Sequence, residues 1–477
     1  MIKLLDSHYT TIYNLLLSVL PRSWLRDTAK LTGFVLRLRG LRPELLVLAI
    51  FTMLERNCMV SIEGLYQRYQ YVCSKLNYPC ISDTAFYNQI NKTQFEAFAE
   101  QVFTRLAKAC FGLNSLTEVV ELLEILQERG LDIVDIFATD GSDLRLRDGA
   151  RKVKGQHLTC KGSGGISQKE LHGTFSLVYQ SLMRLTITNG VSSERAQIPT
   201  SELKNCVWLA DAGYPNFGIF KELDEQNSYF IVRGLQSMNP IVHSLIAYDT
   251  EGKVKHTVTL EKPTPLKQIA HLLDKTLSYD MEVELSNKFK CRVIRSYVPD
   301  TMRSDRHAKS KGKDGFAYFY TNFPREALDL KQVVAFYRLR WGIEIFWKAL
   351  KSFNNLRSDR LLKDGVIHGM IFMCLAWVSL KVAVAQQVEP FLDGKKMSLL
   401  KVAMYSGDTL IDLLYHLWQQ DEEHPVPKAD LKRLVMALSR CVKAKPSKIN
   451  REQCRSVAYV IEELRREPQL RREEHAA

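Results

Sequence analysis

The sequence predicts an α/β protein with a strand-rich centre between two helical ends. Short apolar runs, each followed closely by Gly, Asn or Pro, occur in the centre and are typical of buried strands. Both ends show the wider apolar spacing of amphipathic helices. A chain of 477 residues is too long for one simple core, so we expect several segments. Their predicted bounds are 1–128, 129–234, 235–321, 322–392 and 393–477.

The N-terminal segment is predicted to be helical. Ser61 and Ser82 suit the N-caps of two successive helices. The second helix carries Asn88 and Gln89, whose amides can reach base edges, so the pair indicates a helix-turn-helix for DNA binding. Residues 67–78 make the spacing looser than in a minimal motif, and a plain helical bundle fits the same residues.

The second segment predicts a core of strands at 133–139, 174–188, 206–210 and 228–233 and a helix at 215–226. Asp140 follows the first strand and Asp211 follows the third, before Ala-Gly-Tyr-Pro. An Asp at the end of a strand places its carboxylate at the rim of the sheet, where open α/β folds bind ligands. Each Asp alone is also typical of a turn or a helix N-cap. Asp140 is preferred because its competitors lie before or inside the apolar run or beyond the turn: Asp132, Asp135 and Asp143.

The third segment predicts a β-rich insertion. It alternates in short strand-like runs at 241–248, 256–260, 282–285, 290–297 and 316–320. Asp211 and Glu344 are 133 residues apart, more than one strand and one helix need, and the insertion accounts for this separation.

The fourth segment contains the most informative run, YRLRWGIEIFWKALK, which has no Pro and one Gly and predicts a single helix. With about 100° per residue, five of its side chains project within roughly 80° on one face: Tyr337, Arg340, Glu344, Lys348 and Lys351. One carboxylate among cations suits a site that holds a metal ion and phosphates. The alternative is a solvated face of salt bridges, since Glu344 and Lys348 form an i,i+4 pair.

The remaining helices are predicted to be structural or to carry a basic strip. Gly369 to Leu380 is a core helix, too short and too polar-flanked to cross a bilayer. The segment after Gly394 predicts amphipathic helices, and the last dozen residues a frayed tail. The basic strip comprises Lys428, Lys432, Arg433, Arg440, Lys443, Lys445, Lys448 and Arg451.

Charge favours a polyanionic partner. The chain has 66 Lys and Arg against 53 Asp and Glu, a formal charge of +13. Two basic runs flank the predicted site and suit DNA backbone, although a solvated loop explains the second equally well. They are Arg145, Arg147, Arg151, Lys152, Lys154 and Lys161, and Arg303, Arg306, Lys309, Lys311 and Lys313.

Other sites and compartments are disfavoured. The ten cysteines form no Cys-x2-Cys pair, and neither His-Glu-x2-His nor a phosphate-binding loop occurs. The Gly-rich stretch 161–165 lacks phosphate-loop spacing and predicts a hairpin tip. No signal peptide is recognised, because Asp6 and His8 interrupt the apolar start. We therefore expect a cytoplasmic protein without a membrane partner.

The helix motif Tyr-x2-Arg-x3-Glu-x6-Lys, which is complete here, resembles the signature of bacterial DDE transposases of the insertion sequence 4 family. The Arg340–Trp341 pair and Lys348 also match. Asp140-Gly141 and Asp211-Ala212-Gly213 look like the family's two upstream motifs. The resemblance covers residues 129–392 with specific motifs and the two ends only by general character.

The resemblance implies a ribonuclease-H-like core, interrupted by the insertion, that cleaves and joins DNA in cut-and-paste transposition. Asp140, Asp211 and Glu344 would be catalytic and hold Mg²⁺, with Mn²⁺ able to substitute. The other helix residues would bind DNA phosphates: Tyr337, Arg340, Lys348 and Lys351. The implied partners are double-stranded DNA, as terminal repeats and as target, and a second copy of the chain in a homodimer on DNA.

One departure leaves a step of the family's reaction open. Members that form a hairpin-ended intermediate carry a Trp that stacks on a flipped base, and Ala317 stands where it is expected. Phe316 or Tyr318 could stack instead. Two further functions remain: a domesticated, catalytically silent DNA-binding regulator, and a nuclease that cleaves strands without joining them.

Overall fold

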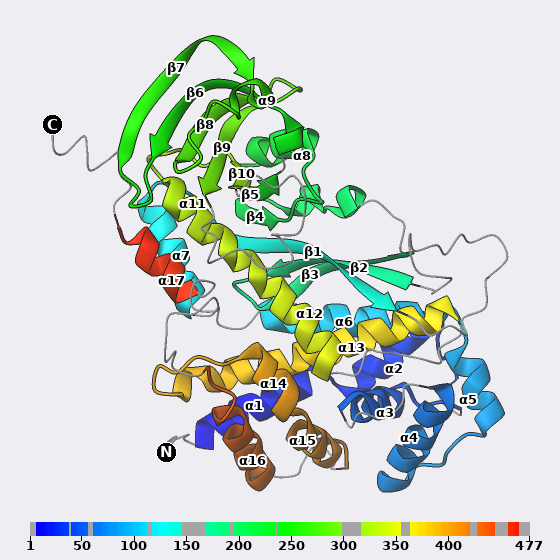
Figure 1. Cartoon of the computed structure of the whole chain (residues 1–477). Helices are drawn as coiled ribbons and strands as arrows, with labels where there is room; N and C mark the ends of the chain where they lie inside the picture. Colours follow the sequence, from blue (N-terminus) through cyan, green and yellow to red (C-terminus); the bar gives the residue numbers. More distant parts are fainter. Residues whose placement is uncertain are drawn as a thin grey trace.

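The computed structural model describes residues 6–37, 40–55, 61–111, 117–145, 168–189, 194–234, 236–297, 316–353, 363–419, 427–443 and 457–466. Helices form a layer below one large sheet, and a long pair of helices crosses in front of the sheet (Figure 1). The predicted loops that fall outside these residues are the first basic run beyond Arg145, the second basic run (Arg303 to Lys313) and the Gly-rich stretch 161–165.

Ten strands form a single sheet in the order β3-β2-β1-β4-β5-β10-β9-β8-β6-β7. The pairs β1–β4 and β4–β5 are parallel, and all other pairs are antiparallel. The insertion therefore continues the core sheet through the pairing of β10 with β5. The bounds are β1 Asp135–Arg145, β2 Gln168–Ser176, β3 Ser181–Asn189, β4 Cys206–Ala210, β5 Tyr229–Gly234, β6 Ile241–Tyr248, β7 Val254–Pro265, β8 Ser278–Glu284, β9 Lys290–Tyr297 and β10 Phe316–Thr321.

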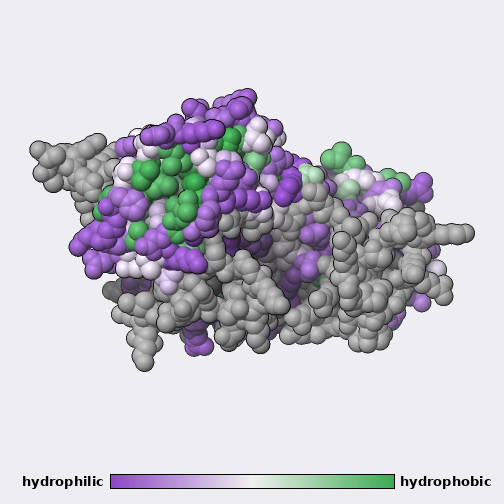
Figure 2. Space-filling model, turned by 45° about the horizontal axis from the view of Figure 1, so that its top comes forward, coloured by the Kyte–Doolittle hydropathy of each residue, from purple (hydrophilic) through white to green (hydrophobic). Residues whose placement is uncertain are grey.

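Burial follows the position of each strand in the sheet. All five residues of β4 are buried, as expected for a parallel strand covered on both faces. β7 has a partner on one side only and exposes most of its residues, with Lys and Pro along its length, as is typical of edge strands. Figure 2 shows apolar side chains gathered on the insertion with hydrophilic ones around them. Val258 and Leu272 are the large apolar side chains exposed in this segment.

The N-terminal segment is helical as predicted: α1 Asp6–Val19, α2 Arg22–Leu31, α3 Pro43–Glu55, α4 Ile62–Lys75, α5 Asp83–Ile90, α6 Gln94–Phe111 and α7 Thr117–Glu128. Ser61 and Ser82 cap α4 and α5, accepting hydrogen bonds from Gly64 N at 2.9 Å and Ala85 N at 3.4 Å. Asn88 is exposed, whereas the Gln89 amide donates to the Phe34 carbonyl. Gln89 therefore holds α5 onto the turn after α2 and is not available to a base edge in this conformation.

The predicted core helix is α13, Asp364–Val388, which is longer than the apolar run that predicted it. By length and composition it is the one helix among the described residues that could cross a membrane, but 94% of its most apolar stretch is buried inside the molecule. It packs on α6 and α3, and its buried Lys381 ammonium contacts Glu55 of α3. α13 is thus the centre of the helical layer.

The C-terminal segment contributes α14 Leu399–Tyr405, α15 Gly407–Gln419, α16 Lys428–Ser439 and α17 Val457–Leu464. The first three pack below the sheet, while α17 lies beside α7 and α11, Leu330–Tyr337 (Figure 1). In the basic strip, Arg433 pairs with Asp430, and Lys445, Lys448 and Arg451 lie outside the described residues, as does most of the predicted frayed tail.

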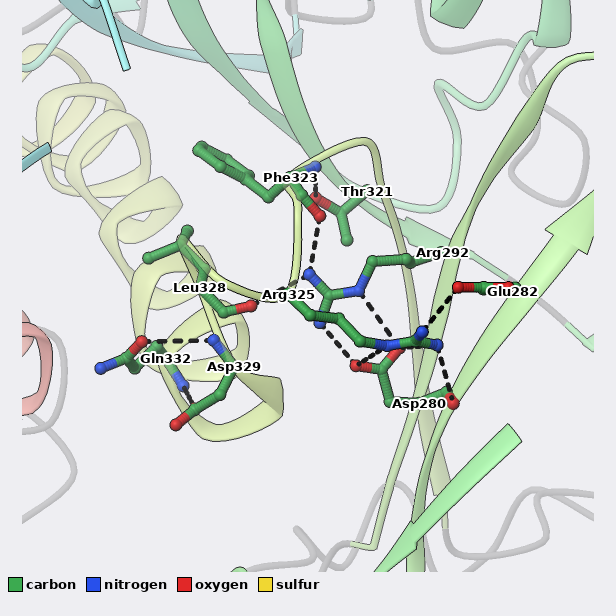
Figure 3. Close-up of polar contacts among 9 residues, drawn as sticks. All are labelled: Asp280, Glu282, Arg292, Thr321, Phe323, Arg325, Leu328, Asp329 and Gln332. Atoms are coloured by element: carbon green, nitrogen blue, oxygen red, sulfur yellow. Dashed lines mark hydrogen bonds and ion pairs between the residues drawn. The ribbon is translucent and has the colours of Figure 1, made fainter. Parts of the chain in front are cut away.

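An ion-pair cluster around the buried Asp280 fixes the loop that leads from the insertion into the next helix (Figure 3). We call Asp280, Glu282, Arg292 and Arg325 the junction. The Asp280 carboxylate lies 2.6 Å from Arg292 Nη2 and 3.2 Å from Arg325 Nε. Arg292 Nη1 also donates to the carbonyls of Phe323 and Leu328, at 2.7 and 2.9 Å. The junction therefore sets where α11 begins.

Candidate active site

The register of β1 and β4 brings the two predicted aspartates together. Thr139 and Ala210 are partners in this parallel pair, and Asp140 and Asp211 are the next residue of each strand's chain. Adjacent strands lie about 4.8 Å apart. Asp211 begins a turn, in which its side chain accepts from Ala212 N at 2.7 Å. The two carboxylates therefore start from neighbouring points at one rim of the β1–β4 pair.

One expectation about Asp140 is wrong. β1 does not end there but continues to Arg145, paired only with β2, in which Asp140 is the partner of Gly173. β4 turns away at Asp211 while β2 still supplies hydrogen-bond partners, so β1 remains extended. Asp140 lies where β1 separates from β4, and this opening gives its side chain access to solvent.

The competing aspartates have other environments. Asp135 is buried at the opposite end of β1 and accepts from Ser176 Oγ at 2.7 Å and Ile136 N at 2.6 Å. Burial raises its pKa to about 7. Asp132 and Asp143 are exposed, and Asp143 offers its main-chain carbonyl to Lys351. Asp135 is therefore a structural residue of the strand.

The predicted signature helix is interrupted, which corrects the single-helix expectation. Capped by Asp329, α11 spans Leu330–Tyr337, a 3₁₀ turn covers Arg338–Arg340, and α12 spans Trp341–Phe353. The 3₁₀ turn winds more tightly than an α-helix and changes the angle between Tyr337 and the residues of α12. The predicted common face of about 80° therefore applies only within α12.

Arg340 is the centre of the site. Its guanidinium forms an ion pair with Glu344, one turn further, and Nη1 lies 3.7 Å from Asp140 Oδ1. Burial disfavours its charge, but nearby Tyr337, Asp140, Glu344 and Asp211 outweigh this and raise the Arg340 pKa. We call Asp140, Asp211, Arg340 and Glu344 the active-site cluster. It has three carboxylates around one arginine.

Three further signature residues surround this cluster. The Tyr337 hydroxyl is buried near Arg340, Asp211 and Arg233, and burial raises its pKa. Lys351 reaches across to the Asp143 carbonyl of β1. Lys348 is exposed to solvent. Two cations and a buried phenol thus lie on the same segment as Arg340 and Glu344.

Arg233 is a candidate that the sequence interpretation missed. Ala210 and Val232 are partners in the parallel β4–β5 pair, so Arg233 is the next position on β5, as Asp211 is on β4. The row Asp140, Asp211 and Arg233 therefore crosses three neighbouring strands. The signal was a charged residue at the end of the apolar run FIV, the same rule that selected both aspartates.

The donor chemistry of the active-site cluster fits a hard divalent cation, because carboxylate oxygens are the ligands that Mg²⁺ and Mn²⁺ take. In the part of the chain described, however, no group of three or more potential ligands is already gathered closely enough to hold a metal ion. Arg340 contacts both Asp140 and Glu344 instead. A metal would therefore bind in competition with the arginine.

The predicted stacking residues are enclosed in the insertion. Tyr318 is buried, and its hydroxyl accepts from Arg295 Nε at 3.2 Å. The Arg295 guanidinium also covers one face of the Phe316 ring, 3.5 Å from its centroid. In this conformation Tyr318 cannot stack on a base, and one face of Phe316 is occupied. The run 303–313 lies outside the described residues.

Comparisons with known proteins match this chain to transposases. A family model described as "Transposase DDE domain" matches residues 135–379. A curated relative, "Transposase for insertion sequence element IS231E" of Bacillus thuringiensis subsp. finitimus, is 24% identical in an alignment 281 positions long. The alignment covers 53% of this chain and 56% of that protein. The match therefore spans little more than half of that relative.

A search of solved structures adds the "piggyBac transposase synaptic complex with hairpin DNA". The alignment covers 92% of this chain and 87% of that one, at 11% identity and a TM-score of 0.43. A similarity this weak carries no weight in the fold comparison.

Proposed function

This chain belongs to the transposase DDE domain family, and from this premise we propose that it cleaves and joins DNA strands at the ends of an insertion sequence. The complete Tyr-x2-Arg-x3-Glu-x6-Lys motif supports assignment to the insertion sequence 4 family. We further propose that β1 to β5 and α8, Phe217–Glu225, form a ribonuclease-H-like core. The strand order β3-β2-β1-β4-β5, with antiparallel pairs among the first three strands and parallel pairs among the last three, supports this proposal.

One observation carries this proposal. Asp140 and Asp211 extend from neighbouring parallel strands, and Arg340 joins Asp140 to Glu344 of the signature helix. Three acidic residues from distant parts of the chain thereby meet at one rim. A helix face of solvated salt bridges gives no reason for this convergence.

In the proposed mechanism Asp140, Asp211 and Glu344 hold Mg²⁺, or Mn²⁺ in its place. When bound, the metal would supply Lewis-acid activation of a water or 3′-hydroxyl and would offset the charge on the departing oxygen. Arg340 turns from its carboxylates to grip a phosphate through two N–H groups, while Lys351 and Lys348 act as point charges. Tyr337 donates its hydroxyl to a phosphate oxygen, and Arg233 adds positive charge beside Asp211.

The proposed partners are double-stranded DNA and a second copy of the chain. α4 and α5 would contact the terminal repeat, with exposed Asn88 rather than Gln89 reaching the bases. Joining two ends requires both to be held at once, which a homodimer on DNA provides. Target DNA would lie across the same rim as the cleaved end.

A gel assay with a labelled duplex that carries the element's own end tests the proposal. We expect nicks at the end with Mg²⁺, none with EDTA, and none with Glu344→Gln, whose end binding is retained. Glu225→Gln, on the exposed surface of α8, makes the same change of charge away from the site and should nick normally. Cleavage by Glu344→Gln would refute the assignment of the helix.

A second candidate is a catalytically silent DNA-binding regulator with the same fold. The pairing of Arg340 with Asp140 and Glu344, without a preformed metal cluster among the described residues, is the observation that favours it. End binding without cleavage in Mg²⁺ and Mn²⁺ would support this alternative.

A strand-transfer assay with precut ends separates a transposase from a nuclease that only hydrolyses.

A further inference from the structure

The glycine opposite Asp140 has no room for a side chain. Gly173 of β2 is the register partner of Asp140. A Cβ at this position would lie 2.6 Å from Trp347 Cζ2, 2.9 Å from Trp347 Cη2 and 3.0 Å from Leu182 Cδ2. Carbon atoms normally pack about 3.5–4.0 Å apart. The outer ring of the Trp347 indole therefore occupies the space that any other residue would fill.

Trp347 lies one turn after Glu344 on α12. Its side chain is 4% exposed, and the neighbouring Phe346 packs on Phe175 of β2 with ring centroids 5.2 Å apart. Because residues three and four apart share a helix face, the depth of the indole determines how closely the Glu344 end of α12 approaches the sheet. Lys351, one turn later, is tied to the Asp143 carbonyl.

A glycine on α12, Gly342, provides a contrast to Gly173 of β2. A Cβ on Gly342 would lie 3.7 Å from Phe175 Cε1 and 3.8 Å from Leu177 Cγ, both ordinary contacts. Gly342 is closer to Glu344 in sequence than Trp347 is, yet alanine fits there. The close approach between β2 and α12 is therefore specific to Gly173 and Trp347.

We propose that Gly173 is a positioning residue of the active site. Resting on the proposed function, the inference is that the missing side chain seats Trp347 directly on β2 and so sets the distance between Glu344 on α12 and Asp140 on β1. A methyl group at 173 would push the helix outward by on the order of 1 Å. A misplacement of that size can lower a catalytic rate about 100-fold.

Nicking by three purified variants tests the positioning role. We expect Gly173→Ala to nick about 100-fold more slowly than wild type while binding the element end within about twofold. Gly342→Ala is the matched control and should nick at the wild-type rate. Trp347→Phe removes the outer ring that meets the new methyl group, so the double variant Gly173→Ala/Trp347→Phe should regain at least tenfold over Gly173→Ala.

A metal-binding readout keeps this test independent of turnover. Free Mn²⁺ measured by electron paramagnetic resonance should show weaker binding by Gly173→Ala than by wild type and Gly342→Ala, with recovery in the double variant. Wild-type nicking in Gly173→Ala, or loss of nicking and Mn²⁺ binding that Trp347→Phe does not restore, would overturn the positioning role. If neither the wild type nor any variant nicks DNA but the expected ranking of their Mn²⁺ affinities is found, the proposed function fails and the positioning role stands.

Discussion

The active-site cluster and the junction contain the same kinds of side chain in different proportions. In the junction two carboxylates meet two arginines, and Asp280 is fully buried. In the active-site cluster three carboxylates surround Arg340, and the side chains of Asp140 and Glu344 are 21% and 27% exposed. The junction has equal numbers of acidic and basic side chains around a carboxylate that is shut off from water, and only its outer member Glu282 is exposed. The active-site cluster is acidic, and its carboxylates are reached by water.

This difference indicates what each cluster can do. Burial alone would raise the pKa of Asp280, but Arg292 and Arg325 hold it below its ordinary value, so the junction stays charged and closed. The active-site cluster keeps excess negative charge that one arginine cannot neutralise. A divalent cation would balance this charge, and solvent access gives the cation a route to the site.

The largest expected effect is a difference between removing one carboxylate from the junction, which should lower stability, and removing one from the active-site cluster, which should abolish nicking. Asp280→Asn leaves the buried Arg292 without its carboxylate partner and Arg325 with Glu282 alone, so it should lower the free energy of unfolding by about 3–5 kcal/mol. Asp140→Asn relieves repulsion among carboxylates, so it should leave stability within about 1 kcal/mol of wild type while abolishing nicking. Urea unfolding followed by circular dichroism measures both. Equal stability losses in the two variants would remove the distinction.

Asp135 extends the comparison of the two clusters to a buried carboxylate whose hydrogen-bond donors are a hydroxyl and backbone N–H groups rather than arginines. Its pKa is raised from 3.8 to about 7, so the fold binds this proton more tightly than the unfolded chain does. The resulting stabilisation is complete below about pH 4 and is lost as the pH rises through 7. Each unit of pKa shift corresponds to about 1.4 kcal/mol.

The variant Asp135→Asn cannot ionise, so its stability relative to wild type should rise by on the order of a few kcal/mol between about pH 4 and pH 8. Urea unfolding of both proteins at several pH values measures this difference. A difference that does not change with pH would mean that Asp135 titrates normally and is wetter than its burial indicates.

The smallest effect concerns the phosphate contacts at the edge of the active-site cluster. Lys351→Ala should slow nicking about tenfold, the equivalent of roughly 1.4 kcal/mol, because one charged contact to the scissile phosphate is lost while the carboxylates remain. Lys221→Ala, on exposed α8, controls for the change in net charge. If the two variants nick equally fast, Lys351 only ties α12 to β1.

Local patterns predicted those strands whose ends are marked in the sequence. β4, β6 and β9 match their predicted bounds. β4 and β6 are mainly apolar runs that are each followed by a turn. The same rule located Asp140 and Asp211. It did not predict β1 beyond Asp140, since those polar residues remain extended only through their pairing with β2.

The remaining differences depend on contacts between distant parts of the chain. Nothing in the sequence marks the 3₁₀ turn at Arg338–Arg340, which contains neither Gly nor Pro. The sequence predicted that the Gln89 amide could contact a base, but in the folded chain this amide donates to the Phe34 carbonyl, which lies 55 residues away in the sequence. The contact of Arg340 with Asp140 likewise joins residues 200 positions apart, which no local pattern reports.

The pairing of β5 with β10 has a consequence for synthesis of the chain. Gly234 and its partner Tyr318 are 84 residues apart, so the apolar strand β5 emerges long before its antiparallel neighbour. At 5–20 residues per second, its edge stays open on the ribosome for roughly 4–17 s. An open, apolar edge strand invites pairing with other nascent chains. The yield of soluble protein should therefore depend on how fast the insertion is translated.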